Sequence, residues 1–325
     1  MFPNRLASLF CLVLLLPVNV QAWDALGHRL TAYLAYDQMN DTEQSHWISI
    51  LQAHPRFQQD FVDAMPADIA RLGQAEQQRW QFGQAAIWPD IARGFQGFDQ
   101  RRFHFPNRHW IDGTWVRDDV PLQGNIYLNM DALPEQTGPA NDEITQHSDA
   151  DNVLTGLVYA RYALITQTSP EERAIALSWL LHLIGDIHQP LHTGALFTPN
   201  LFPEGDRGGN LTRVDGSNLH AIWDQALRGP SLNRNLAELR AIAAQLDDSF
   251  AFEPGQWMLE SREILHADVY PDNVIANIQR SDNTGNQLGS MQLRDTYREA
   301  MREQALQRVA EAGHRILGTL LNLPR

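Results

Sequence analysis

The chain has 325 residues, of which 43% are hydrophobic, and a formal net charge of −14. Its length suits a single helical domain with one core. Binding of duplex DNA through a broadly basic surface is excluded, because basic side chains must neutralise the phosphates in such a complex. Any nucleic-acid function must therefore depend on a local site.

Residues 1–22 are predicted to be a secretory signal peptide. A basic start, MFPNR, precedes the apolar stretch LASLFCLVLLL, and a small-residue cleavage site, VQA, precedes Trp23. A membrane anchor is the alternative, but the apolar stretch is shorter than the roughly 20 residues that a bilayer requires, and a proline interrupts it. Cleavage before Trp23 would leave residues 23–325 as a periplasmic or secreted domain. The only cysteine, Cys11, would be removed, so no disulfide is expected.

Apolar residues recur at helical spacing in several later segments, and strand-like alternation is scarce. The predicted helices are Leu30–Met39, Val153–Thr166, Glu171–Gln189, Leu236–Leu246 and Asp295–Leu321. Predicted loops, rich in Gly, Pro, Asn and Asp, are Phe95–Arg108, Asp131–Asp151 and Thr198–Ser217. No later segment resembles a membrane span and no linker divides the chain. We expect an all-α fold, a single compact helical domain with long functional loops.

The segment WLLHLIGDIHQPLH, residues 179–192, holds the densest group of potential metal ligands. His182 and Asp186 are four residues apart, so they share one face of a helix. Pro190 is expected to end that helix and to let His192 turn back toward the same face. Three groups that can bind a metal ion would then converge.

The segment NLHAIWD repeats this spacing with His220 and Asp224. A single His–Asp pair is more often an ion pair than a metal site. Two pairs in apolar sequence favour metal binding, because a buried charge is costly unless it is paired or bound to metal.

Further candidate ligands lie nearer the N-terminus, at His28, Asp90 and His109. Each has an ordinary alternative: Asp90 could cap a helix, and His109 could be a loop histidine. Nitrogen and carboxylate ligands without thiolate suit Zn²⁺ and also admit Mn²⁺ or Fe²⁺.

Taken together, these motifs resemble the single-strand-specific zinc nuclease family, the fungal S-one and P-one enzymes with their plant and bacterial relatives. The resemblance covers nearly the whole mature chain. It includes W-x4-H from Trp23 to His28, WPDxxR, HWID, HxxxDxxQPLH, a GGN turn at 208–210, NLHxxWD, WMLES and AGHRILGTLLN. The motifs occur in order, and the first lies at the expected mature terminus.

The resemblance implies an all-α fold around a trinuclear zinc site, with three Zn²⁺ per chain. The ligands of the first zinc would be Asp90, His109, His182 and Asp186. The second would share Asp186 and add His28 with the free α-amino group and carbonyl oxygen of Trp23. The third would bind His192, His220 and Asp224.

The resemblance also assigns substrate contacts and a reaction. Arg93 would be catalytic together with Asp186 and would bind the phosphate; an ion pair with Asp90 is the alternative. Trp110 would stack on a base, with core packing as the alternative. Base contacts would be Asp112, Gly208 and Asn210. The remaining histidines are expected to be surface or core residues: His46, His54, His104, His147, His188, His266 and His314.

The implied function is an exported zinc-dependent endonuclease that cleaves single-stranded DNA and RNA to 5′-phosphate products, with 3′-nucleotidase activity on 3′-nucleotides. No stable protein partner and no membrane contact are expected. Zinc-dependent phospholipase C, which shares the fold, is one alternative, although the short spacing to His28 and the aspartate at position 224 favour the nuclease. A non-catalytic extracytoplasmic zinc-binding protein is another.

Overall fold

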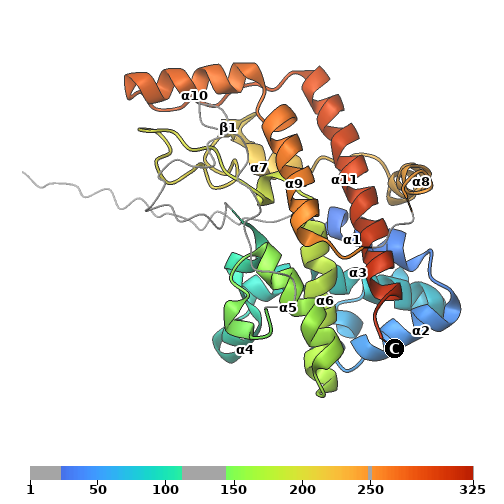
Figure 1. The fold of residues 1–325 in the computed structure, drawn as a ribbon. Helices are drawn as coiled ribbons and strands as arrows, with labels where there is room; N and C mark the ends of the chain where they lie inside the picture. The colour runs from blue at the N-terminus through green and yellow to red at the C-terminus, as the bar shows by residue number, and fades with distance from the viewer. Residues whose placement is uncertain (1–22, 112–143, 248–250, 325) are drawn as a thin grey trace, which may run out of the picture.

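The computed structural model describes residues 23–111, 144–247 and 251–324, and these fold into helices joined by loops (Figure 1). The longer helices are α1 (Ala25–Tyr36), α2 (Asp41–Leu51), α3 (Gln74–Ile91), α4 (Gly97–Phe103), α5 (Val153–Thr166), α6 (Pro170–Ile187), α7 (Leu219–Asp224), α8 (Leu232–Ala243), α9 (Pro254–Ile264), α10 (Asp272–Thr284) and α11 (Asp295–Leu321). Short helical turns are η1 (Gln58–Asp63), η2 (Ile69–Arg71), η3 (Ala92–Gly94), η4 (Pro106–His109), η5 (His147–Asp149), η6 (Pro190–His192) and η7 (Leu265–Val269). The predicted all-α, single-domain fold is confirmed.

Helix α6 lies at the centre of the molecule. The Ser169 side chain accepts a hydrogen bond from the backbone N–H of Glu172, and Pro170 occupies the first turn, where its missing N–H costs nothing. Every residue from 174 to 187 is buried. A helix that is buried on all sides must be surrounded by others; α6 packs against α5, α3, α2 and α11. The polar residues between 174 and 187 are therefore shielded from solvent.

The other long helices surround this centre. Figure 1 shows α11, in red, running along the molecule, and it packs against α1, α8 and α6. Helix α1 also packs against α3, so it joins two parts of the core: Ala32 belongs to one buried apolar cluster and Leu30 to the other.

A two-stranded hairpin precedes α7. Strands β1 (Arg213–Val214) and β2 (Ser217–Asn218) pair in antiparallel register, with Arg213 opposite Asn218. The turn residues Asp215 and Gly216 have φ values of 49° and 74°, as a tight two-residue hairpin requires. Asn218 then caps α7 by accepting a hydrogen bond from the Ala221 N–H. The hairpin thus sets where α7 begins.

The helix predictions were accurate where the apolar spacing is regular. The bounds of α5 and α11 agree with the predicted ones. Helix α1 begins five residues earlier than predicted, because the Asp24 side chain accepts hydrogen bonds from two backbone N–H groups of its first turn. This extension places His28 on the helix.

The predicted loop Phe95–Arg108 was partly wrong, because α4 and η4 lie within it. Most of the predicted loop Asp131–Asp151 lies outside the described residues. Among the helices that are described, none has the length and apolar character needed to cross a membrane.

Candidate metal centre

The pair His182 and Asp186 lies on one face of α6, and both side chains are fully buried. His182 Nε2 is 3.1 Å from Asp186 Oδ2. The predicted helical pair is confirmed as a geometric unit in the core.

Helix α1 brings His28 to the same carboxylate. His28 Nε2 lies 3.3 Å from Asp186 Oδ1, and its ring stacks on His182 with centroids 4.0 Å apart. His109, from η4, approaches the other oxygen, with Nδ1 3.1 Å from Asp186 Oδ2. The two oxygens of Asp186 therefore face different histidines, as a carboxylate shared by two metal ions would.

Asp90 reaches this group from the last turn of α3. Its Oδ1 is 3.8 Å from His182 Nε2 and 3.9 Å from His109 Nδ1. The alternative that Asp90 caps a helix is wrong, because the residue lies inside α3 and 8% of it is exposed.

A second group forms where η6 meets α7. His192 Nε2 is 3.1 Å from His220 Nε2, and the latter is 3.5 Å from Asp224 Oδ2. All three residues are buried. Pro190 does end the long helix, at Ile187, and the short turn η6 presents His192 as the sequence predicted.

Backbone carbonyls set the protonation of three histidines. The Nδ1 atoms of His182 and His220 donate to the carbonyl oxygens of Ala86 and Gly208, each at 2.7 Å, and His192 Nδ1 donates to that of His109. A carbonyl only accepts, so Nδ1 must carry a proton, and in the neutral ring Nε2 then carries a lone pair. His182 Nε2 lies 2.9 Å from His109 Nδ1, and the Nε2 atoms of His192 and His220 lie 3.1 Å apart.

This arrangement fits bound cations. Neutral His192 and His220 would otherwise place two lone pairs 3.1 Å apart in the protein interior. Both His28 nitrogens and Asp186 Oδ1 are buried without a hydrogen-bond partner among the described residues. Such groups are costly unless a metal ion compensates them. Metal-ligating histidines commonly donate their second nitrogen to a carbonyl, as three do here.

Burial shifts the protonation of these groups. It lowers the pKa of His28 and of His182 to about 4, and lowers those of His109 and His192 well below the ordinary value. The histidines are thus neutral and able to donate to a metal ion. Burial raises the pKa of Asp186 to about 7, although His28 Nε2 lies 3.3 Å from its Oδ1. A carboxylate so destabilised requires positive charge nearby.

Trp23 packs against the first turn of α1. Its side chain is fully buried and packs on Gly27, where an added Cβ would be 2.6 Å from Trp23 Cβ. The next N–H, of Asp24, donates to the Asp224 carbonyl oxygen at 3.1 Å. Arg228 donates to the carboxylate of Asp24. The backbone at position 23 is therefore fixed near the end of α7.

Arg93 follows α3 and lies next to the metal centre. Its Nη2 is 2.6 Å from Asp90 Oδ1, so the ion pair that the sequence offered as an alternative is present. The side chain is 18% exposed. The guanidinium can thus contact Asp90 and reach solvent at the same time.

A cavity of about 440 Å³ opens beside the second group, lined by Trp110, Gly208 and His220 among others. Trp110 is 38% exposed, so the core-packing alternative is wrong. Gly208 has a φ of 58°, and a Cβ there would lie 2.3 Å from the Leu191 carbonyl oxygen, so only glycine fits.

The other predicted base contacts are placed differently. Asn210 is buried and its amide donates to the Arg207 carbonyl oxygen at 2.8 Å, which holds the turn together. It is not among the residues that line the 440 Å³ cavity. Asp112 lies outside the described residues.

Two supporting residues were missed from the sequence. Gln189, fully buried, donates to Asp224 Oδ1 at 2.8 Å. Asp206, also fully buried, accepts hydrogen bonds from Leu196 N, Gly209 N and Tyr270 Oη, and so shapes the glycine turn. The position of Gln189 in the HQPLH motif, between two candidate ligands, was the sequence signal that could have identified its supporting role.

Among the histidines assigned no ligand role, His54 and His188 are buried and His147 is exposed, in agreement with prediction.

The fold and this centre define an all-α protein with a buried cluster of histidines and aspartates able to hold metal ions. The family model described as S1/P1 Nuclease matches residues 23–324. The chain belongs to the S1/P1 nuclease family.

The individual relatives share only 24–31% sequence identity with the parts of this chain that they match. The chain is 31% identical over 127 residues to Endonuclease 4 of Arabidopsis thaliana, covering 34% of this chain and 40% of that protein. It is 24% identical to Endonuclease 1 of the same plant, covering 71% and 63%. It is 26% identical to Nuclease S1 of Aspergillus oryzae, covering 68% and 59%. The chain thus spans less than two thirds of the length of these relatives.

Proposed function

We propose that this protein is a zinc-dependent endonuclease that hydrolyses phosphodiester bonds in single-stranded DNA and RNA, leaves 5′-phosphates and also acts as a 3′-nucleotidase. Family membership and the relatives named as endonucleases support the reaction class. The observation that carries the proposal is the convergence of buried histidine and aspartate side chains from α1, α3, η4, α6, η6 and α7, several of whose nitrogen and oxygen atoms have no hydrogen-bond partner among the described residues.

Three zinc sites are proposed. The atoms of His192, His220 and Asp224 lie within 4.8 Å of one another, as do those of His109, His182 and Asp186, the second set being completed by Asp90. His28, Asp186 and the amine and carbonyl of Trp23 would hold the remaining ion. When bound, zinc supplies an activated water and stabilises negative charge on the reacting phosphate.

Side chains of the protein would bind the phosphate and the base of the substrate. Arg93 would bind the non-bridging phosphate oxygens, because a guanidinium gains hydrogen bonds as negative charge builds up on them. Its contact with Asp90 would hold it in place. Trp110 is exposed beside the cavity, where one unstacked base can lie against its face. A paired base cannot leave its stack without cost, so single strands are preferred.

Asp112, Gly208 and Asn210 are proposed to contact the base edge. Gly208 lines the cavity, and its carbonyl already accepts from His220. Export after cleavage before Trp23 is part of the same proposal, since only cleavage there creates the required terminal amine.

The test is hydrolysis of single-stranded DNA, RNA and 3′-AMP by the mature protein, with zinc counted in the same preparation. We expect the protein to cleave these substrates and to lose its activity after EDTA treatment. Because of the family resemblance, we also expect about three zinc ions per chain. Release of phosphocholine from lipid without nucleotide release would point to a phospholipase. Bound zinc without any phosphoester hydrolysis would support a non-catalytic zinc-binding protein.

A further inference from the structure

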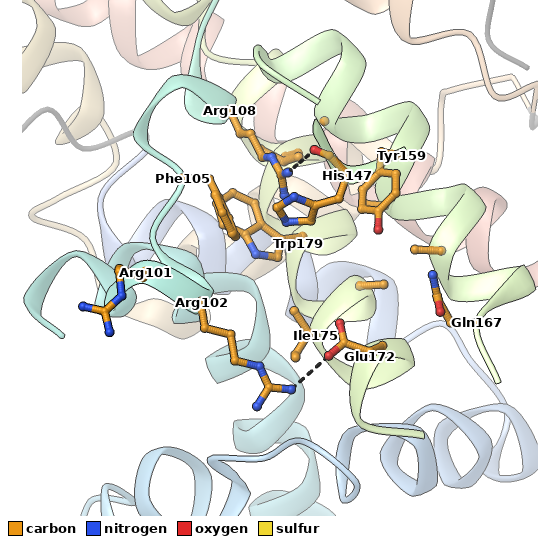
Figure 2. Close-up of a pocket in the computed structure, with 15 residues that line it drawn as sticks. Arg101, Arg102, Phe105, Arg108, His147, Tyr159, Gln167, Glu172, Ile175 and Trp179 are labelled. Carbon is orange, nitrogen blue, oxygen red and sulfur yellow. Dashed lines mark hydrogen bonds and ion pairs between the residues drawn. The ribbon is translucent and has the colours of Figure 1, made fainter. Parts of the chain in front are cut away.

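A second cavity, of about 320 Å³, lies between α4, α5 and α6 (Figure 2). We name it the α5–α6 cavity. None of its lining residues is a candidate metal ligand, and none lines the cavity beside Trp110. Its volume is within the range of small-molecule sites, roughly 300–1,000 Å³. Its main lining side chains are Arg101, Arg102, Phe105, Arg108, Tyr159 and Trp179.

The α5–α6 cavity is locally basic in an acidic chain. Three arginines and one glutamate line it, whereas the whole chain carries a formal charge of −14. Figure 2 shows Arg102 bound to Glu172, at 2.9 Å, while Arg101 stands at the rim. A concave site with net positive charge favours an anion.

Arg108 is the buried cation of this cavity. Only 5% of it is exposed, and it donates to the carbonyl oxygens of Ala150 at 2.7 Å and His147 at 2.9 Å. No carboxylate in the described part of the chain pairs with it. An anionic ligand would offset the cost of burying this charge.

The inner wall is aromatic. The Arg108 guanidinium lies 4.1 Å from the centroid of the Phe105 ring, and Tyr159 lies opposite. Trp179 is 3% exposed, yet its indole N–H has no hydrogen-bond partner among the described residues. In Figure 2 this nitrogen lies on the edge of the ring nearer Arg102, toward the open space. A ligand with a flat ring and a hydrogen-bond acceptor would satisfy both features.

We propose that the α5–α6 cavity binds a nucleotide unit, with its phosphate at Arg101 and Arg102 and its base against Phe105 and Trp179. The choice of a nucleotide among aromatic anions rests on the proposed function. Two sources share this chemistry: a free 5′-mononucleotide product, and one nucleotide of a strand that extends beyond the reaction centre. The site is close to that centre, because the Trp179 ring lies 5.3 Å from the ring of His109, the neighbour of Arg108.

The test is calorimetric titration of the zinc-loaded protein with 5′-AMP. We expect two binding sites on the wild type. Trp110→Ala should remove one. Ala163→Phe, which fills the α5–α6 cavity, should remove the other, and Arg101→Glu should weaken it about tenfold, or about 1.4 kcal/mol. Arg71→Glu, an equal charge change on the distant turn η2, is the control and should preserve both sites.

The outcomes separate the two proposals and the two sources. A single 5′-AMP site that Trp110→Ala abolishes and Ala163→Phe leaves intact overturns the inference, while cleavage of single strands would still support the nuclease. Two sites without any cleavage would support the inference alone. If a strand occupies the site, Arg101→Glu should raise KM for a decanucleotide but not for a dinucleotide; if only product does, KM should change for neither.

Discussion

The side-chain amide of Gln189 donates a hydrogen bond to Asp224 Oδ1 at 2.8 Å, while its carbonyl oxygen accepts one from the Leu191 N–H at 2.6 Å. Only an amide can make both bonds. Asp224 is thereby held with Oδ2 toward His220.

Replacement of Gln189 by Glu should weaken the zinc site that we propose at Asp224. The new carboxylate cannot donate to Asp224 and would repel it. We expect zinc affinity at one of three sites to fall about 10- to 100-fold, the usual effect of losing such a supporting contact. Equilibrium dialysis against zinc buffers measures it. Gln245→Glu, in the exposed turn that follows α8, is the control. Full retention of all zinc would contradict the positioning role.

Replacement of Arg93 by Ala should lower turnover about 10²- to 10³-fold, as for the loss of one preorganised donor to the reacting group. Zinc content should stay near three per chain, because Arg93 contacts Asp90 without being a ligand. Single-turnover kinetics and metal analysis of the same sample check this. If turnover is unchanged, Arg93 has no catalytic role and only forms an ion pair with Asp90.

Replacement of Trp110 by Ala should raise KM for single-stranded substrates and reduce discrimination against duplexes. Loss of one base stack costs about 1–3 kcal/mol. Phe98→Ala is a matched control, since Phe98 is a 66% exposed aromatic residue on α4. Equal effects of the two substitutions on KM would place the base elsewhere.

A chain that begins Met-Trp23, with the methionine retained, should lose zinc and activity. The nitrogen of Trp23 would then be an amide, whose lone pair is delocalised into the carbonyl group and is a poor donor to a metal ion. The Asp24 N–H contact with Asp224 does not depend on that nitrogen, so the fold should persist. Circular dichroism and metal analysis, compared with the chain that begins at Trp23, test both statements. Full zinc content in the extended chain would refute the role of the amine.

His54 should make the zinc-free protein sensitive to acid. It packs edge-on against Trp88, 4.3 Å between centroids, and burial lowers its pKa from 6.5 to about 3. Between these values the unfolded chain binds a proton that the folded chain does not, so stability falls as the pH falls from 6.5 toward 3. His54→Asn, which keeps an acceptor for the Arg56 N–H, should reduce this loss by a few kcal/mol, at about 1.4 kcal/mol per pKa unit.

Urea unfolding in EDTA at pH 8 and at pH 4.5 measures this effect. The difference between the variant and the wild type at pH 8 gives the packing cost of the substitution. If that difference is the same at both pH values, His54 does not contribute to the acid sensitivity.

The local pattern of the sequence was sufficient for two parts of the site. His182 with Asp186, and His220 with Asp224, share helix faces because four residues make about one turn. Their apolar surroundings also predicted their burial. The bounds of α5 and α11 followed from regular apolar spacing, whereas α4 was missed because its polar residues resemble a loop.

Only the tertiary structure determined which distant residues meet. His28 and His109 reach Asp186, and Asp90 reaches His182, through the packing of α1, η4 and α3 around α6. The tautomers of His182 and His220 depend on carbonyls 96 and 12 residues away, and the cavity beside Trp110 is lined by residues from separate parts of the chain. Periodicity records which face of a helix is apolar; the contacts between faces arise from packing, which no local pattern encodes.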